Sequence, residues 1–225
     1  MAIAIDSTGV ANSTTASSTT RTVAFNNVAG TFLAVGITRF RNVTTNSVTY
    51  NGVAMTKAVD SIEASSNRAE LWYLASPATG SNNIVVTFSA ATDDALVIGS
   101  ISYTGVDNAS PIGATASQAG ATTSTAPSIN ITTLNNNSYI MDAMYKNSAA
   151  TETATAPQTE VWGQVDAYGT EGGAGSYKSF PTAGATSMAW TLSASTLWIM
   201  CAMEIKESVS GATAFPRKAL LGVGR

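Results

Sequence analysis

Short runs in which apolar residues alternate with polar or small residues recur along the whole chain. In residues 32–38 the large side chains Leu33, Val35 and Ile37 occupy every second position. Alternate side chains of a strand point to the same face, so this run predicts a strand with one face in the core and the other closely covered. The same pattern predicts strands at 68–75, 83–89, 95–103, 127–132, 139–146, 159–166, 176–180, 186–192 and 196–205.

The strongest local signal is Asn51-Gly52, which stands between the alternating segments 47–50 and 53–56. Asn-Gly readily adopts the two positive φ values of a type I′ turn, whose twist matches that of the flanking strands. The sequence therefore predicts a β-hairpin over residues 47–56.

Clusters of Gly, Pro, Asn and Ser separate the predicted strands, and no helical segment of ten to fifteen residues stands between them. This spacing favours an all-β protein, an antiparallel β-sandwich of the jelly-roll-like kind, over a βαβ fold. The last predicted strand is apolar on both faces between Leu197 and Met203, which places it in the middle of a sheet.

The two halves of the chain resemble each other. Pro77 corresponds to Pro181, and Phe88-Ser89-Ala90 corresponds to Leu192-Ser193-Ala194, both at an offset of 104 residues. We therefore predict two similar Greek-key-like halves, 22–116 and 126–207, within a sandwich that spans 22–207. We favour a single core shared by both halves, with two tandem sandwiches and a chance likeness of Ala/Thr-rich strands as the alternatives.

The ends of the chain differ from its middle. Residues 1–21 are predicted to form an N-terminal arm or edge segment, because 8–20 are rich in Ser and Thr. Residues 208–225 are predicted to form a docking tail against a neighbouring subunit, a frayed terminus being the alternative. The residues proposed for this contact are Phe215, Arg217, Lys218, Leu220, Leu221 and Arg225.

Composition excludes several kinds of chemistry. The chain has 26 Ser and 32 Thr but no His and one Cys, and only 11% of its residues are charged. Without histidine there is no Ser-His-Asp or Cys-His catalysis and no imidazole zinc site. A single Cys201 forms neither an intrachain disulfide nor a thiolate cluster.

Carboxylates remain the available acid–base groups, so a glycosidase-like pair is the enzyme hypothesis to weigh. Glu160 and Asp166 are expected on one face of a strand but about 20 Å apart, too far for such a pair. Asp93 and Asp94 lie between two predicted strands, where aspartate favours turns, and Asp107 lacks the spacing of a calcium loop. We predict no catalytic residue, no metal, no cofactor and no enzymatic activity.

Aromatic residues offer a binding function instead. Trp72, Trp162 and Tyr168 are candidates for stacking on sugar rings, with core packing as the alternative for those within strands.

Charge and the N-terminal sequence limit partners and location. The net charge of −3 divides into −6 over residues 1–207 and +3 in the tail. Such a balance gives no general attraction to nucleic acid or to an anionic membrane. The segment Met1–Asp6 lacks the pattern of a signal peptide.

One family resemblance can be stated. It rests on residues 48–56, on Glu70-Leu71-Trp72-Tyr73-Leu74, on 77–88 and on Tyr103-Thr104-Gly105-Val106-Asp107 followed by Ser110-Pro111-Ile112. Together these resemble a class of Thr/Gly-rich, jelly-roll-like β-sandwich proteins found in phage virions and in bacterial surface proteins. The resemblance covers about residues 22–206 and implies an architecture, with no catalytic residues to transfer.

These observations lead to an expected function. We expect a non-enzymatic structural protein on the capsid or tail surface of a phage particle, made in the host cytoplasm and located in the virion. Its expected partners are other virion proteins and copies of itself, with no nucleic acid and no membrane. The alternative is a carbohydrate-binding module for host or environmental glycans. The sequence leaves the position on the particle and the symmetry undecided.

Overall fold

The computed structural model describes residues 1–12, 17–40, 43–63, 67–92 and 96–208. These residues form antiparallel β-sheets joined by turns, as the alternating pattern predicted, and no helix is present among them. The search for a helix long and apolar enough to cross a membrane accordingly finds none in the described part of the chain.

The first half of the chain forms two sheets. The inner sheet has the order β1 (Ala4–Asn12), β9 (Leu96–Thr104), β3 (Phe32–Arg39), β7 (Asn67–Ala75) and β6 (Thr56–Glu63). The outer sheet has the order β2 (Ser18–Asn27), β8 (Gly80–Thr92), β4 (Thr45–Tyr50) and β5 (Val53–Ala54).

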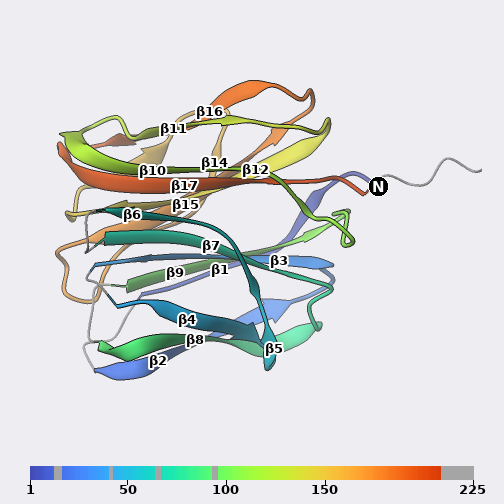
Figure 1. The fold of residues 1–225 in the computed structure, drawn as a ribbon, viewed down its shortest axis with the longest axis horizontal. Helices are drawn as coiled ribbons and strands as arrows, with labels where there is room; N and C mark the ends of the chain where they lie inside the picture. The colour runs from blue at the N-terminus through green and yellow to red at the C-terminus, as the bar shows by residue number, and fades with distance from the viewer. Residues whose placement is uncertain (13–16, 41–42, 64–66, 93–95, 209–225) are drawn as a thin grey trace, which may run out of the picture.

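The second half forms two sheets in the same manner. Its inner sheet has the order β10 (Ile112–Ser124), β17 (Thr196–Ile205), β12 (Ser138–Lys146), β15 (Gly172–Phe180) and β14 (Thr159–Val165). Its outer sheet has the order β11 (Ser128–Thr132), β16 (Ala185–Leu192) and β13 (Glu152–Ala154). The two inner sheets face each other in the middle of a four-layered body (Figure 1).

The strand orders of the halves correspond, except that β5 has no counterpart in the second half. When β5 is left out and the other strands are matched in chain order, starting with β1 and β10, the two inner sheets have the same order and so do the two outer sheets. The single shared core that we favoured from the sequence is therefore wrong. Each half is a complete two-layered sandwich, because its inner and outer strands pair within that half.

Three apolar cores hold the four layers together. One lies inside the first sandwich and contains Trp72, and one lies inside the second and contains Trp190. The third, which we call the central core, lies between the inner sheets and takes residues from both halves. Its buried members include Phe32, Ala34, Leu71, Ile101, Tyr103, Met141, Ala143, Tyr145, Trp162, Ile199, Cys201 and Met203. Both inner sheets are thus buried on both faces.

The contacts across the central core follow a two-fold relation. Strand β10 packs on β6 and β1 packs on β14, while β17 packs on β7 and β9 packs on β15. Exchanging the halves converts each of these contacts into its partner, which is the property of an isologous interface. Phe32 stacks on Tyr73 in the first half and Tyr139 stacks on Tyr177 in the second, with 17° between the ring planes in both cases.

Trp162 breaks this symmetry, because its indole packs against glycines of both inner sheets. A Cβ on Gly99 or Gly175 would lie 2.0 Å from its indole ring, and a Cβ on Gly36 would lie 2.6 Å from it. Gly36 and Gly99 belong to the first half, whereas Trp162 and Gly175 belong to the second. The indole therefore fills a space that exists because three strands carry glycine there.

Of the two alternatives for the N-terminal segment, the edge segment is correct for the described residues and the arm is wrong. Strand β1 pairs with β9 at the edge of the inner sheet, and β2 begins at Ser18. Ile3 and Ile5 contribute to the central core. Serine and threonine side chains suit an edge strand with one solvated face, so this composition does not distinguish an arm from an edge strand.

The boundary between the halves was also misplaced. The predicted joint at 117–125 falls almost entirely within β10, and the chain crosses to the second half between the end of β9 at Thr104 and the start of β10 at Ile112. Gly105 has φ = 73°, and a Cβ there would lie 2.2 Å from the carbonyl oxygen of Ala2. Strands β6, β10 and β13 were missed, because weak alternation did not separate them from the neighbouring loops.

Two local predictions are confirmed. Asn51 and Gly52 have positive φ values of 50° and 76°, and Tyr50 pairs with Val53 in the hairpin. Strand β17 lies between β10 and β12. Its alternate side chains enter the central core and the core of the second sandwich, which explains why it is apolar on both faces.

We expect Gly99→Ala to lower the free energy of unfolding by about 2–3 kcal/mol, because the new methyl group overlaps the Trp162 ring. Gly36→Ala should cost less, since its Cβ has more room. Urea unfolding followed by tryptophan fluorescence measures both.

A double-mutant cycle tests the cause. In a Trp162→Leu background, Gly99→Ala should cost much less, because the indole is gone. An equal cost in both backgrounds would show that the strain arises elsewhere.

Candidate functional site

The body has two unlike ends. The pairing of β12 with its neighbours defines these ends. Lys146 is paired with Gly172 and Trp198 at one end, and Tyr139 is paired with Ser179 and Ile205 at the other. We call the first the loop end and the second the terminal end. Both ends of the described chain lie at the terminal end, where the Met1 amino group donates to the carbonyl oxygen of Ser208 at 3.0 Å (Figure 1).

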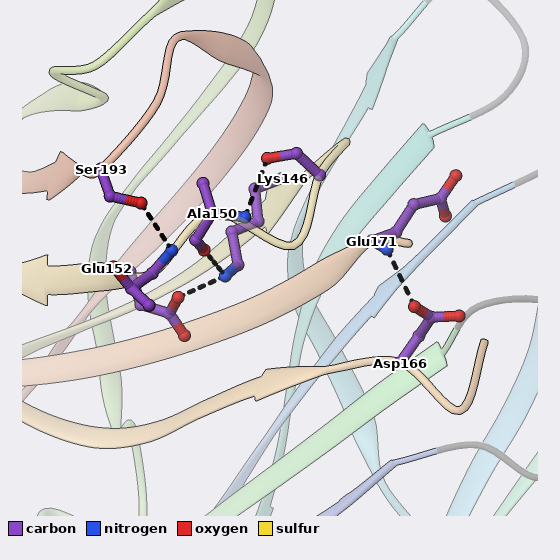
Figure 2. Close-up of polar contacts among 8 residues, drawn as sticks. Lys146, Ala150, Glu152, Asp166, Glu171 and Ser193 are labelled. Atoms are coloured by element: carbon purple, nitrogen blue, oxygen red, sulfur yellow. Dashed lines mark hydrogen bonds and ion pairs between the residues drawn. The ribbon is translucent and has the colours of Figure 1, made fainter. Parts of the chain in front are cut away.

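A buried ion pair organises the loop end of the second sandwich. The side chain of Lys146 is fully buried, and its Nζ donates to the Glu152 carboxylate and to the carbonyl oxygen of Ala150 (Figure 2). Ser193 accepts a 3.0 Å hydrogen bond from the Thr151 backbone N–H. The lysine therefore holds the turn between β12 and β13, and Ser193 joins this turn to the loop between β16 and β17.

Two carboxylates lie side by side next to this lysine. A Cβ on Gly163 would lie 2.4 Å from Glu152 Oε1 and 2.5 Å from Glu160 Oε1, so both oxygens occupy the space beside that glycine. Burial, followed by the charge of Glu152, raises the pKa of Glu160. A surface hollow of about 240 Å³ is lined by Lys146, Glu152, Glu160 and Gly163. The carboxylate nearest to Glu160 is thus Glu152, which the sequence pattern did not single out.

Asp166, the other carboxylate weighed from the sequence, shapes a loop. It accepts backbone N–H bonds from Tyr168, Thr170 and Glu171 at 2.8–3.0 Å, and the bond from Glu171 is visible in Figure 2. The loop between β14 and β15 is thereby held from within. It presents Tyr168, which is 45% exposed.

The other two aromatic candidates do not reach the surface. Trp72 and Trp162 are 6% and 3% exposed, in the core of the first sandwich and in the central core. Neither ring has a face available for stacking on a sugar, so their prediction as glycan contacts is wrong. Each inner sheet is covered by its own outer sheet on one face and by the inner sheet of the other half on the second face. A single sandwich would have left that second face open to solvent.

Glu70, a further carboxylate that the sequence offers for acid–base chemistry, and the candidate Asp107 both have structural partners. Glu70 is buried and accepts the indole N–H of Trp72 at 3.0 Å. Asp107 accepts the backbone N–H of Ala109 at 3.1 Å, which is a turn role. Asp93 and Asp94 lie outside the described residues. Within the ranges that the structure describes, no group of three or more Cys, Asp and Glu side chains is placed to hold a metal ion.

A groove opens at the terminal end. It has a volume of about 380 Å³ and is lined by Ala2, Ile3, Asn137, Ser138, Tyr139, Ser179, Phe180, Pro181 and Glu207. Its walls come from the first residues of the chain, from β12 and β15, and from the last described residues. Tyr139 and Phe180 are partly exposed there, which gives the groove an apolar floor.

A second hollow adjoins the groove and shares Asn137 and Glu207 with it. Its volume is about 350 Å³, and its other lining residues are Asp107, Asn135, Asn136 and Lys206. The Nζ of Lys206 donates to Ser110 Oγ at 2.7 Å. Asp107 and Glu207 outweigh the single positive charge of Lys206, so this hollow has a net negative charge beside the apolar groove.

Glu204 holds the loop between β11 and β12, and residues of this loop line both hollows. Its carboxylate accepts backbone N–H bonds from Ala114, Leu134 and Asn135 at 2.8–2.9 Å and the hydroxyl of Ser138 at 2.7 Å. Burial opposes its ionisation, but these hydrogen bonds outweigh that effect and lower the pKa of Glu204. The loop between β11 and β12 therefore depends on one ionised carboxylate.

Sequence reasoning missed the buried charges Asp142, Lys146 and Glu204. Each is a charged residue within an otherwise apolar strand, and that signal could have found them. Burial raises the pKa of Asp142 to about 7, although Trp190 and Ser176 donate hydrogen bonds to it. The six tail residues proposed for subunit contact, Phe215, Arg217, Lys218, Leu220, Leu221 and Arg225, lie outside the described residues.

Comparison of the chain with protein-family models, with curated proteins and with solved structures finds no match.

Glu204→Gln is expected to lower the free energy of unfolding at pH 7 by about 3 kcal/mol, because the amide nitrogen cannot accept the bonds that the carboxylate receives. The folded-state pKa of Glu204 is below its unfolded value. Its contribution is therefore present above the unfolded pKa and is lost as the pH falls through the folded pKa. The difference in free energy of unfolding between the variant and the wild type should decrease as the pH is lowered from 6 to about 3.

Urea unfolding of both proteins across this range provides the measurement. Glu207→Gln is the matched control, since the Glu207 side chain makes no hydrogen bond to another described residue, and it should change the free energy of unfolding by less than about 0.5 kcal/mol. A gap that stays constant with pH would contradict the role of the Glu204 charge.

Proposed function

We propose that the protein is a non-enzymatic structural component of a phage particle, on the capsid or tail surface. It is built as two jelly-roll-like sandwiches and held by contacts between copies and by its terminal segments. Its partners are other virion proteins and copies of itself, and it involves neither nucleic acid nor membrane.

The observation that carries this proposal is the polarity of the body. The N-terminus and Ser208 are hydrogen-bonded to each other at one end, whereas the Tyr168 loop and the Lys146–Glu152 turn of the second sandwich lie at the other. This arrangement would allow the protein to attach through one end and to present these loops at the opposite end, as we propose for a protein on the surface of a particle.

The use of the polar groups also supports a structural role. Asp142, Lys146, Asp166 and Glu204 all bind backbone or side-chain groups of the body itself. The hollows described above open on the surface, and in the one that contains two carboxylates Glu152 is engaged by the buried Lys146. These features favour a scaffold over a catalyst.

If the protein is a virion component, mass spectrometry of particles purified by two successive density gradients should find it at a fixed ratio to the major capsid protein. A host cytoplasmic protein followed through the same steps serves as the control and should fall away. Recovery of the protein in the lysate but not in the purified particles would refute the proposal.

Glycan binding is the second candidate, and the exposed Tyr168 is the observation that favours it. The loop that carries Tyr168 is held by Asp166, so a sugar ring could stack there with little ordering cost. If this function is correct, Tyr168→Ala should reduce binding on a glycan array at least tenfold. Leu134→Ala is the control and should leave binding unchanged, because the Leu134 side chain is 69% exposed in the loop between β11 and β12, at the terminal end. An array without any binding would remove this candidate.

A further inference from the structure

The groove at the terminal end exposes the rings of Tyr139 and Phe180 in its floor. Tyr139 continues a row of rings that passes through Tyr103 to Phe32, with centroids 6.1 and 6.2 Å apart, so the groove reaches the aromatic edge of the central core. Burial raises the pKa of Tyr139, which agrees with a hydroxyl in a partly dry setting. A partly exposed aromatic edge of this kind gains stability when it is covered.

The chain itself supplies a segment that fits. Residues 209–225 follow Ser208, and Glu207 lines the groove. Phe215 stands seven residues beyond Ser208, and that connector spans up to about 23 Å when extended. Ser210-Gly211 lies within the connector and suits a reversal of direction. The tail therefore has the length to return to the groove beside which it begins.

The order of residues in the tail matches the order of the two hollows. Phe215-Pro216 is apolar and is followed directly by Arg217-Lys218, just as the apolar groove adjoins the hollow that contains Asp107 and Glu207. Residues 1–207 carry −6 and the tail carries +3, so attraction between body and tail has the correct sign.

We propose that the groove between Tyr139 and Phe180 is the receptor for the C-terminal tail of the same copy, with Phe215 in the groove and Arg217 and Lys218 over the acidic hollow. The short connector gives the tail a high effective concentration at its own groove, which favours this arrangement over exchange between copies in dilute solution. The inference does not depend on the protein being a virion component.

Paired cysteines test the contact in the full-length protein. Ser179 is exposed and lines the groove, and Ala214 precedes Phe215, so Ser179→Cys combined with Ala214→Cys should form an intramolecular disulfide when oxidised at low micromolar concentration. The native Cys201 is fully buried and stays out of the reaction. The control pair is Ser195→Cys with Ala214→Cys, because Ser195 is exposed at the loop end.

The groove pair should crosslink at least tenfold faster than the control pair, and adding Phe215→Ser should remove most of that advantage. Equal rates for the two pairs would overturn the proposal. Mixing the Ser179→Cys protein with the Ala214→Cys protein tests whether the tail binds the groove of a second copy instead. Disulfide-linked dimers that form as fast as the intramolecular bond would overturn the assignment to the same copy and place the tail in the groove of a neighbour.

Discussion

The packing of the Trp162 indole against Gly36, Gly99 and Gly175 sets the distance between the two inner sheets. Because the three glycines lack side chains at that point, the sheets approach closely enough for the rest of the central core to close around the ring. The middle strands of each inner sheet are consequently buried on both faces, and residues from both halves contribute to one apolar layer. Neither half alone would keep both faces of its inner sheet out of water, because one face is covered by the other half.

The two-fold relation between the halves explains the polarity of the molecule. The orders of the facing sheets run in opposite directions, β10 over β6 and β1 over β14, so the relating axis lies along the strands. Equivalent loops of the two halves therefore meet at the same end. The terminal end combines the chain start, the aromatic stacks of both halves and the groove, while the loop end carries the Lys146–Glu152 pair and the Tyr168 loop.

Ten charged side chains are buried among the described residues, and several of them hold parts of the body together. Lys146 and Glu204 hold turns by binding backbone groups, which is a local function that a neutral side chain of similar size performs less well. Asp142 lies where Trp190 and Ser176 of the second sandwich converge. These groups do not converge on a common cavity, and this is the reason that the proposed role is one of support and contact.

The sequence by itself determined the β class, the Asn51-Gly52 hairpin and the central place of the strand from Leu197 to Met203, since these depend on local turn chemistry and on the period of two. It also indicated a repeat, through residues spaced by 104 positions. The pairing of Trp162 with glycines some 60 and 120 residues earlier in the chain was decided only in the tertiary structure. So were the strand at residues 4–12 and the meeting of Glu152 with Glu160. Alternation reports which positions face away from water, but it does not report whether another sheet of the same sandwich or the sheet of a second sandwich covers them.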